Sequence, residues 1–338
     1  MATPAQVCDQ GEHTKPPDPG HLIRLPHLAL PVHGWDVTTG AGVGPLLRDL
    51  SGLGGPSPVY VATEVYPDLP VWLGRAGRRR VPGGLIEPPG MSNDDMLTRH
   101  LAAIAAYTPG LVFLERPALR GSPTDELPMV RQLCDAVADR GAFVLVDESN
   151  ANYCPPDYSA ATLLADTGNL VVLRGISKAF GLGGIRFGVC LSSNAATSWV
   201  REVTPPLQAS SFSLRVGAAI LAAATDPSAG LRARIGAHRR RVIDALANTD
   251  VGPVAAAMSD LPYVLFASTP QPSLNRLREA GIQGKLHMTW GSAGPRSTAV
   301  GRVSIPLSET RLREFETRLA DILCDATPSS PTEELDKG

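Results

Sequence analysis

Two side chains with complementary chemistry follow two apolar segments of the sequence. Asp147 ends the segment Phe143 to Asp147, and Lys178 comes shortly after the segment Leu170 to Leu173. Pyridoxal phosphate chemistry requires these two groups: an amine that forms a Schiff base, and a carboxylate that keeps the pyridine nitrogen protonated. The sequence therefore predicts that Asp147 and Lys178 hold a pyridoxal cofactor.

The elements around these residues predict how they meet. The two apolar segments are typical of strands, separated by a polar loop and a helical spacer, and a Gly-rich turn follows the second. This pattern predicts a parallel α/β sheet, whose sites lie at the carboxyl ends of the strands. Asp147 and Lys178 are 31 residues apart, so one crossover connection can bring both to the same crevice.

Each residue alone has an ordinary explanation. A lysine after a buried strand is usually solvated, and an acid at a strand end often caps a helix. However, Lys178 is the only lysine set in a strand-to-turn motif; the others are Lys15, Lys285 and Lys337. The order of the acid, the lysine and the Gly-rich turn favours the cofactor site.

The same region resembles a known family. Asp147-Glu148 and the run from Ser177 to Gly188 (SKAFGLGGIRFG) are similar to the core of the fold-type I aminotransferases of class I/II, nearest to the histidinol-phosphate aminotransferase-like group. Weaker similarity extends from Val37 to Leu323. The resemblance implies the PLP-dependent transferase fold type I: an α/β architecture with a mostly parallel seven-stranded sheet flanked by helices, plus a smaller C-terminal α/β domain. It also implies pyridoxal 5'-phosphate as the cofactor.

The resemblance assigns phosphate ligands. A Gly-rich turn that leads into a helix presents backbone N–H groups to an anion. In the family, a Thr-x-Gly-Ala turn holds the cofactor phosphate, which implies this role for Gly40, Ala41 and Gly42. Ser177 and Arg186 are further phosphate ligands by the same resemblance, and a guanidinium suits such a charge-assisted contact.

Two more roles follow from the resemblance. Tyr66 matches the aromatic residue that stacks on the pyridine ring, and Arg302 matches the arginine that binds the substrate α-carboxylate bidentately. The ordinary alternatives are a core or surface tyrosine and a solvent-facing strand arginine. We interpret the run Arg78 to Arg80 as a solvated patch.

The sequence departs from the family around the phenolic oxygen of the cofactor. Asn150 stands where the family has a tyrosine, and the turn from Glu115 to Thr124 lacks the family's asparagines. Gly175 stands where the family often has a hydroxyl on the phosphate. We assign Asn150 to the cofactor site, where a neutral amide changes the Schiff-base pKa and the choice of reaction.

Composition limits the alternatives. The 338 residues carry a formal net charge of −2, which gives no electrostatic reason to expect a nucleic-acid or membrane partner. The five cysteines show no metal-ligand spacing, so we expect free thiols in a reducing compartment and no metal site. The N-terminal segment has no apolar core, and we expect a cytoplasmic protein.

The domain prediction has four parts. Residues 1–20 and 326–338 are polar and rich in Pro or Ser, and we expect both to be disordered. Residues 21–235 form a large PLP-binding domain with an N-terminal arm, and residues 236–325 form a small C-terminal domain. The resemblance also implies a homodimer.

Three functions are compatible with these residues. The first is an aminotransferase of biosynthetic or specialised metabolism, in which Lys178 moves the α-proton of an amino acid. The second is a PLP-dependent lyase, replacement, cyclising or decarboxylating enzyme acting on an unusual amino acid, which Asn150 favours. The third is a PLP-binding pseudo-enzyme or regulator, which the retention of Lys178, Asp147, Arg186 and Arg302 disfavours.

Overall fold

The chain divides into two units, each with its own sheet. The structure, a computed structural model, describes residues 22–26, 28–61, 68–81, 92–118, 126–223, 226, 229–247, 249–251, 254, 260–267, 271–291 and 294–325. The first unit is Met1–Ala229 with Trp290–Gly294, and the second is Gly230–Thr289 with Pro295–Gly338. The segments predicted to be disordered, 1–20 and 326–338, lie outside the described residues.

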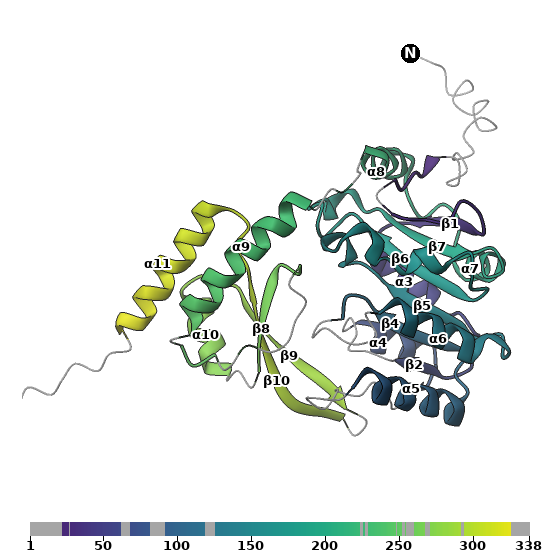
Figure 1. Cartoon of the computed structure of the whole chain (residues 1–338), viewed down its shortest axis with the longest axis horizontal. Helices are drawn as coiled ribbons and strands as arrows, with labels where there is room; N and C mark the ends of the chain where they lie inside the picture. Colours follow the sequence, from purple (N-terminus) through teal and green to yellow (C-terminus); the bar gives the residue numbers. More distant parts are fainter. Residues whose placement is uncertain are drawn as a thin grey trace, which may run out of the picture. The chain divides into compact units, whose positions relative to one another are not determined.

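The first unit is built on a seven-stranded sheet with the strand order β1-β7-β6-β5-β4-β2-β3 (Figure 1). The strands are β1 (Trp35–Gly40), β2 (Val59–Val61), β3 (Arg80–Val81), β4 (Leu111–Glu115), β5 (Phe143–Asp147), β6 (Leu170–Gly175) and β7 (Gly188–Ser193). Strand β7 is antiparallel to both of its neighbours, and the other pairings are parallel. The predicted mostly parallel seven-stranded α/β sheet is confirmed.

Helices cover both faces of this sheet (Figure 1). They are α3 (Val43–Leu50), α4 (Asp68–Arg75), α5 (Asn93–Tyr107), α6 (Leu127–Ala138), α7 (Thr197–Val203) and α8 (Ser211–Ala223). The central strands are apolar throughout because helices cover both faces of the sheet. In β4, Leu111 and Phe113 pack with α3, α4 and α7 on one face. Val112 and Leu114 pack with α5, α6 and α8 on the other face. Because both faces are covered, chemistry is confined to the ends of the strands.

The connection from β5 to β6 differs from the expected helical spacer. It consists of three 3₁₀ helices, η3 (Ala151–Tyr153), η4 (Pro156–Tyr158) and η5 (Ala160–Leu163). Pro156 begins η4, where a missing N–H costs nothing, and the Ser159 hydroxyl accepts the Ala161 N–H at 3.2 Å to begin η5. These local signals divide the connection into short turns.

Arg78 corrects the prediction of a solvated patch. Its side chain is buried, and its guanidinium donates to the carbonyl oxygens of Ser51, Leu53 (2.7 Å) and Ser57 (2.8 Å). Burial lowers the pKa of Arg78 to about 10. Arg78 therefore closes the loop before β2 instead of facing a partner.

The second unit has a three-stranded sheet with the order β8-β10-β9. Its elements are α9 (Ala229–Leu246), β8 (Tyr263–Ala267), α10 (Gln271–Glu279), β9 (Gly284–Gly291), β10 (Gly294–Ser304) and α11 (Glu309–Asp325). We expected a polar insertion around 291–298, but β10 begins at Gly294 and runs through it. Among the described residues, no helix combines the length and apolar character needed to cross a membrane.

Candidate active site

Three glycines lie side by side in neighbouring strands of the first unit. Gly40 at the end of β1 pairs with Gly188 at the start of β7, which also pairs with Gly175 at the end of β6. A Cβ on Gly188 would lie 2.8 Å from the carbonyl carbon of Gly42, and one on Gly40 would lie 2.5 Å from Cγ of Leu46. Because these side chains are absent, the first turn of α3 packs directly against the end of the sheet.

The turn between β1 and α3 lies beside Arg186, and together they form a candidate anion cradle. Gly42 has a φ of 98°, and the first N–H groups of α3 after it have no intrahelical acceptor. The Arg186 guanidinium donates to the carbonyl oxygens of Ala41 at 3.2 Å and Gly183 at 3.1 Å. A Cβ on Gly42 would lie 2.8 Å from Nη2 of Arg186. The predicted residues Gly40, Ala41, Gly42 and Arg186 are therefore brought together at a positive helix end.

Asp147 is the last residue of β5, and its side chain is only 4% exposed. Its Oδ1 accepts two hydrogen bonds from Ser149, one from the backbone N–H at 2.9 Å and one from the hydroxyl. Its Oδ2 has no hydrogen-bond partner within the described ranges. Burial raises the pKa of Asp147, while the Ser149 bonds and the positive charge of Lys178 oppose this rise. The site thus holds a buried carboxylate with one oxygen available.

Lys178 lies on the turn after β6, and its side chain is exposed. Its carbonyl oxygen accepts the Gly181 N–H at 2.9 Å, and its ammonium forms no ion pair in the part of the chain that the structure describes. Ser177 is half-buried and lies close to Gly183: a Cβ on Gly183 would lie 3.6 Å from the Cβ of Ser177. The amine and the carboxylate of Asp147 interact electrostatically, as their placement at the ends of paired strands requires.

Asn150 lies just after β5, where it precedes η3. Its carbonyl oxygen accepts the Tyr153 N–H at 3.1 Å, and its half-buried amide makes no hydrogen bond to any described residue. Asn150 is three residues from Asp147 in the sequence, and its amide oxygen and nitrogen are available for hydrogen bonds to a ligand. Tyr66 lies outside the described residues, as does most of the turn that lacks the family's asparagines.

Sequence reasoning missed a buried charge cluster next to Asp147. The Glu148 carboxylate, fully buried, accepts from the guanidinium of Arg116 at 3.0 Å and from that of Arg174 at 2.7 Å. It also accepts from the Ser159 hydroxyl and the Ala160 N–H, both at 2.6 Å. The signal was Arg174, a charged residue inside an apolar strand, because such a residue is rarely buried without a partner.

This cluster reaches the strand that leads to Lys178. Arg174 donates to Oδ1 of the buried Asn152, and Nδ2 of Asn152 donates to the carbonyl oxygen of Gly175 at 2.5 Å. Gly175 is the last residue of β6, three residues before Lys178. The cluster therefore fixes the ends of β5 and β6 relative to each other.

Arg302 belongs to the second unit, on β10, and is half-buried. Its Cζ lies 4.2 Å from the ring centroid of Tyr263 on β8, a stacking distance for a guanidinium. No carboxylate pairs with it among the residues described. The guanidinium is thus held by a ring and has its donors available for an anion.

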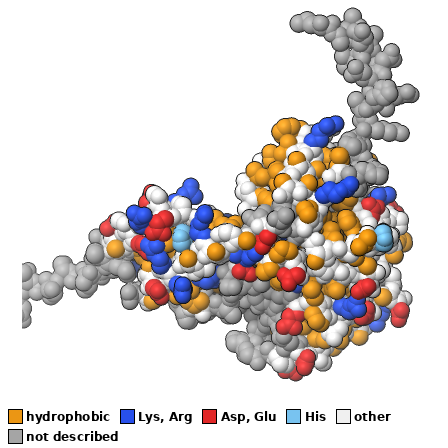
Figure 2. Space-filling model, turned by 45° about the horizontal axis from the view of Figure 1, so that its top comes forward, with side chains coloured by type: hydrophobic (Ala, Val, Ile, Leu, Met, Phe, Trp, Pro, Cys, Tyr) orange, Lys and Arg blue, Asp and Glu red, His pale blue; other side chains and the backbone are white. Residues whose placement is uncertain are grey.

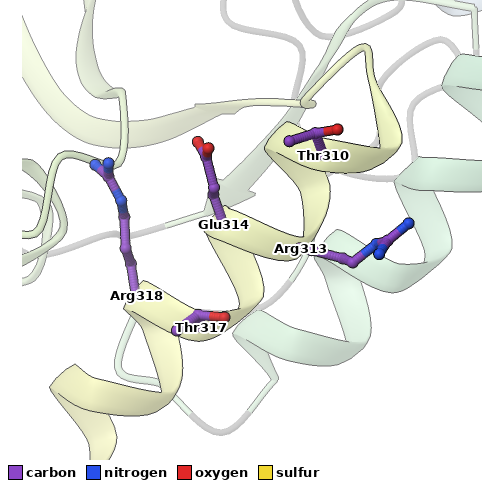
Figure 3. A pocket seen from close by; sticks show the side chains of 5 residues that line it. All are labelled: Thr310, Arg313, Glu314, Thr317 and Arg318. Atoms are coloured by element: carbon purple, nitrogen blue, oxygen red, sulfur yellow. The ribbon is translucent and has the colours of Figure 1, made fainter.

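Two hollows lie elsewhere on the surface, and neither is lined by Asp147 or Lys178. One, of about 350 Å³, is lined by α11 side chains alone: Thr310, Arg313, Glu314, Thr317 and Arg318 (Figure 3). The other, of about 900 Å³, lies between the segment Ile23 to Val37 and two residues of the first unit, Asn194 and Ala222. The acid and the lysine that the sequence singles out therefore lie outside both hollows, at the strand ends.

The fold and these residues are typical of an α/β enzyme class that has an acid at the end of one strand and a lysine on the turn after the neighbouring strand. Residues 96–319 match the family model for aminotransferase class I and II, and the chain belongs to that family. The family predicted from the motif is confirmed.

Sequence relatives support the same assignment. The chain is 32% identical to the histidinol-phosphate aminotransferase of Mycobacterium avium over 222 residues, which cover 63% of this chain and 54% of the relative. The chain spans about half the length of the curated relatives it matches.

Solved structures share the fold at lower identity. The histidinol-phosphate aminotransferase from Clostridium acetobutylicum has a TM-score of 0.68 at 15% identity, with 86% of this chain and 85% of that chain covered. That from Sinorhizobium meliloti, in complex with pyridoxal-5'-phosphate, has a TM-score of 0.61 at 20% identity, covering 86% and 77%. L-threonine-O-3-phosphate decarboxylase from Porphyromonas gingivalis has a TM-score of 0.64 at 14% identity, covering 94% and 93%.

The residues fit the cofactor that the family implies. A phosphate matches the cradle at Gly42 and Arg186, where a side chain at position 42 would collide with the Arg186 guanidinium. A protonated pyridine nitrogen matches Oδ2 of Asp147, to which no described residue donates, and an aldehyde matches the amine of Lys178, which forms no ion pair with a described residue. The family assignment supports pyridoxal 5'-phosphate as the cofactor.

Proposed function

We propose that this chain is a pyridoxal-phosphate-dependent enzyme that acts on an amino acid through Lys178, and that it is an aminotransferase of biosynthetic metabolism. The observation that carries the proposal is the buried carboxylate of Asp147, whose Oδ2 is available on the strand next to the one leading to Lys178. A carboxylate in this position favours the protonated form of the pyridine nitrogen. The relatives named above support transamination as the reaction type.

The proposed ligand contacts follow from the chemistry of each group. The phosphate is bound by Gly40, Ala41, Gly42, Ser177 and Arg186. Tyr66 stacks on the ring, and Asn150 contacts the cofactor near its phenolic oxygen. Arg302 binds the substrate α-carboxylate through its planar guanidinium, which Tyr263 keeps oriented.

In the proposed reaction Lys178 acts at two carbon atoms, the α-carbon of the substrate and the carbonyl carbon of the cofactor. Bound pyridoxal phosphate supplies an electron sink for the bond broken at the substrate α-carbon. Lys178 would hold the cofactor through its carbonyl carbon and would be a free amine while the amino acid occupies that position. That amine would act as the base for the α-proton and as the acid that returns it, which is a proximity and general acid–base effect. Asp147 remains ionised and keeps the ring nitrogen protonated.

The second candidate is a PLP-dependent lyase, replacement, cyclising or decarboxylating enzyme. Asn150 favours this second candidate, because an amide in place of the family's tyrosine changes which product forms after a bond at the substrate α-carbon breaks. The likeness in fold to a decarboxylase is compatible with this candidate.

The test is to follow the fate of the cofactor. The purified protein with pyridoxal phosphate is incubated with a panel of amino acids, and cofactor and products are quantified by chromatography. Transamination converts the cofactor to pyridoxamine phosphate with one 2-oxo acid per site. Return of pyridoxal phosphate with release of ammonia, carbon dioxide or a leaving group supports the second candidate. A lack of any turnover across the panel supports a pseudo-enzyme or regulator.

We also propose that the protein is a cytoplasmic homodimer. Leu207 and Phe212, near the start of α8, are 72% and 67% exposed. Figure 2 also shows hydrophobic side chains gathered on the upper part of the coloured atoms. A second copy would remove this apolar surface from water. The buried thiols of Cys134 and Cys190 are compatible with a reducing compartment. Sedimentation of the wild type and of Phe212→Ser tests the dimer, which the substitution should weaken.

A further inference from the structure

Ser149 forms an unusually complete set of contacts with one oxygen of Asp147. Its backbone N–H donates to Oδ1 at 2.9 Å, and its hydroxyl donates to the same atom. No described residue donates to Oδ2. The two carboxylate oxygens therefore have different roles: one is saturated from within the chain, and the other is left for a ligand.

We propose that Ser149 is a positioning residue whose hydroxyl holds the Asp147 carboxylate so that Oδ2 accepts the protonated pyridine nitrogen of the cofactor. This inference rests on the proposed function and adds a residue to its site. Ser149 touches no reacting atom and acts only through Asp147.

The physical reason lies in the freedom of a carboxylate. The torsion between the Cβ and the carboxyl carbon of aspartate is broad, so a carboxylate without fixed partners can present either oxygen over a range of angles. Two donors converging on Oδ1 restrict this rotation. Hydrogen bonds to an ionised oxygen are also about twice as strong as neutral ones, so they favour the charged form.

The charges around Asp147 show why such a hydroxyl matters. Burial opposes ionisation of Asp147, and the neighbouring Glu148 carboxylate adds to this effect. Glu148 is itself compensated by Arg116 and Arg174, which leaves Ser149 and Lys178 as the groups that favour the Asp147 carboxylate. If Lys178 held the cofactor, its ammonium charge would no longer act on Asp147, and Ser149 would be the described residue that still favours the carboxylate.

The experiment compares two probes on the apo protein by equilibrium binding. One probe is pyridoxal phosphate, and the other is its 1-deaza analogue, in which carbon replaces the pyridine nitrogen. Ser149→Ala keeps the backbone N–H and removes only the hydroxyl. Ser149→Thr retains a hydroxyl and is the matched control. Asp147→Asn reports whether the carboxylate itself senses the ring nitrogen.

Ser149→Ala should weaken binding of pyridoxal phosphate about tenfold, equivalent to about 1.4 kcal/mol, and leave binding of the deaza analogue unchanged. Ser149→Thr should bind both probes like the wild type. An equal loss for both probes, or no loss for either, in Ser149→Ala overturns the inference.

Asp147→Asn separates this inference from the proposed function. If Asp147→Asn loses the preference for pyridoxal phosphate over the deaza analogue but Ser149→Ala keeps it, only the inference about Ser149 fails. If Asp147→Asn also keeps the preference, the assignment of Asp147 to the ring nitrogen fails, and the inference about Ser149 falls with it.

Discussion

Gly175, the last residue of β6, lies directly against the side chain of Val43 at the end of the sheet. A Cβ on Gly175 would lie 2.6 Å from Cγ2 of Val43, far closer than two carbon atoms approach without strain. Val43 is the first residue of α3, on the turn that forms the anion cradle. The glycine that departs from the family's hydroxyl residue is therefore required by the valine packed against it.

Gly175→Ser should lower the free energy of unfolding by about 1–3 kcal/mol, because a β-branched valine has little rotamer freedom with which to move away. Val43→Ala removes the colliding methyl group, so the double variant should be more stable than the sum of the single effects predicts. Urea unfolding of the wild type, both single variants and the double variant measures this coupling. Strictly additive effects would show that the two side chains do not compete for space.

Glu148→Gln should destabilise the protein strongly. The substitution removes the carboxylate charge that Arg116 and Arg174 share in the buried cluster, and breaking a buried pair in this way costs about 3–5 kcal/mol. Glu316→Gln is the matched control, because Glu316 pairs at 2.6 Å with Arg241 on a partly exposed surface and should contribute much less to the free energy of unfolding. Chemical denaturation gives both values, and similar losses for the two variants would contradict a structural role for the buried cluster.

His100 should make stability depend on pH. It is buried, its Nδ1 lies 2.6 Å from the hydroxyl of Tyr60, and burial lowers its pKa from 6.5 to about 4. Above about pH 6.5 the imidazole is neutral in both the folded and unfolded states, so its contribution to stability is complete. As the pH falls further, the unfolded chain takes up the proton first, and the contribution is lost until the folded state also binds the proton near pH 4.

The free energy of unfolding should therefore fall by about 2 kcal/mol more in the wild type than in His100→Asn between about pH 7 and pH 5. The comparison with the variant cancels the contributions of the carboxylates, which titrate in both proteins. Parallel stability curves over this range would mean that His100 ionises equally well in the folded state.

The sequence predicted the parts of the fold that local patterns determine. Apolar segments fix the buried strands, and β5 has the predicted bounds, Phe143 to Asp147. The acid and the lysine could be predicted because the carboxyl ends of parallel strands meet at one edge of a sheet. Asp147 pairs with Leu173 in this register, which places the chain entering the Lys178 turn beside it.

The supporting residues could not be predicted, because their contacts join distant segments. Glu148 binds Arg116 and Arg174, which lie 32 and 26 residues away in the sequence. Gly188 looked like the end of a Gly-rich motif, and only the pairing of β7 with β1 and β6 aligns it with Gly40 and Gly175. Arg78 was misread because composition cannot indicate that three backbone carbonyls need a donor.

The central claim is that Lys178 carries the cofactor. The direct measurement is to incubate the protein with pyridoxal phosphate, reduce it with borohydride so that a carbonyl–lysine linkage becomes a stable secondary amine, and locate the adduct by peptide mass spectrometry. The matched variants are Lys178→Ala and Lys285→Ala. The account predicts one adduct on Lys178, an absorption band that disappears in Lys178→Ala, and an unchanged band in Lys285→Ala. Labelling that persists in Lys178→Ala, or no labelling of the wild type, would contradict it.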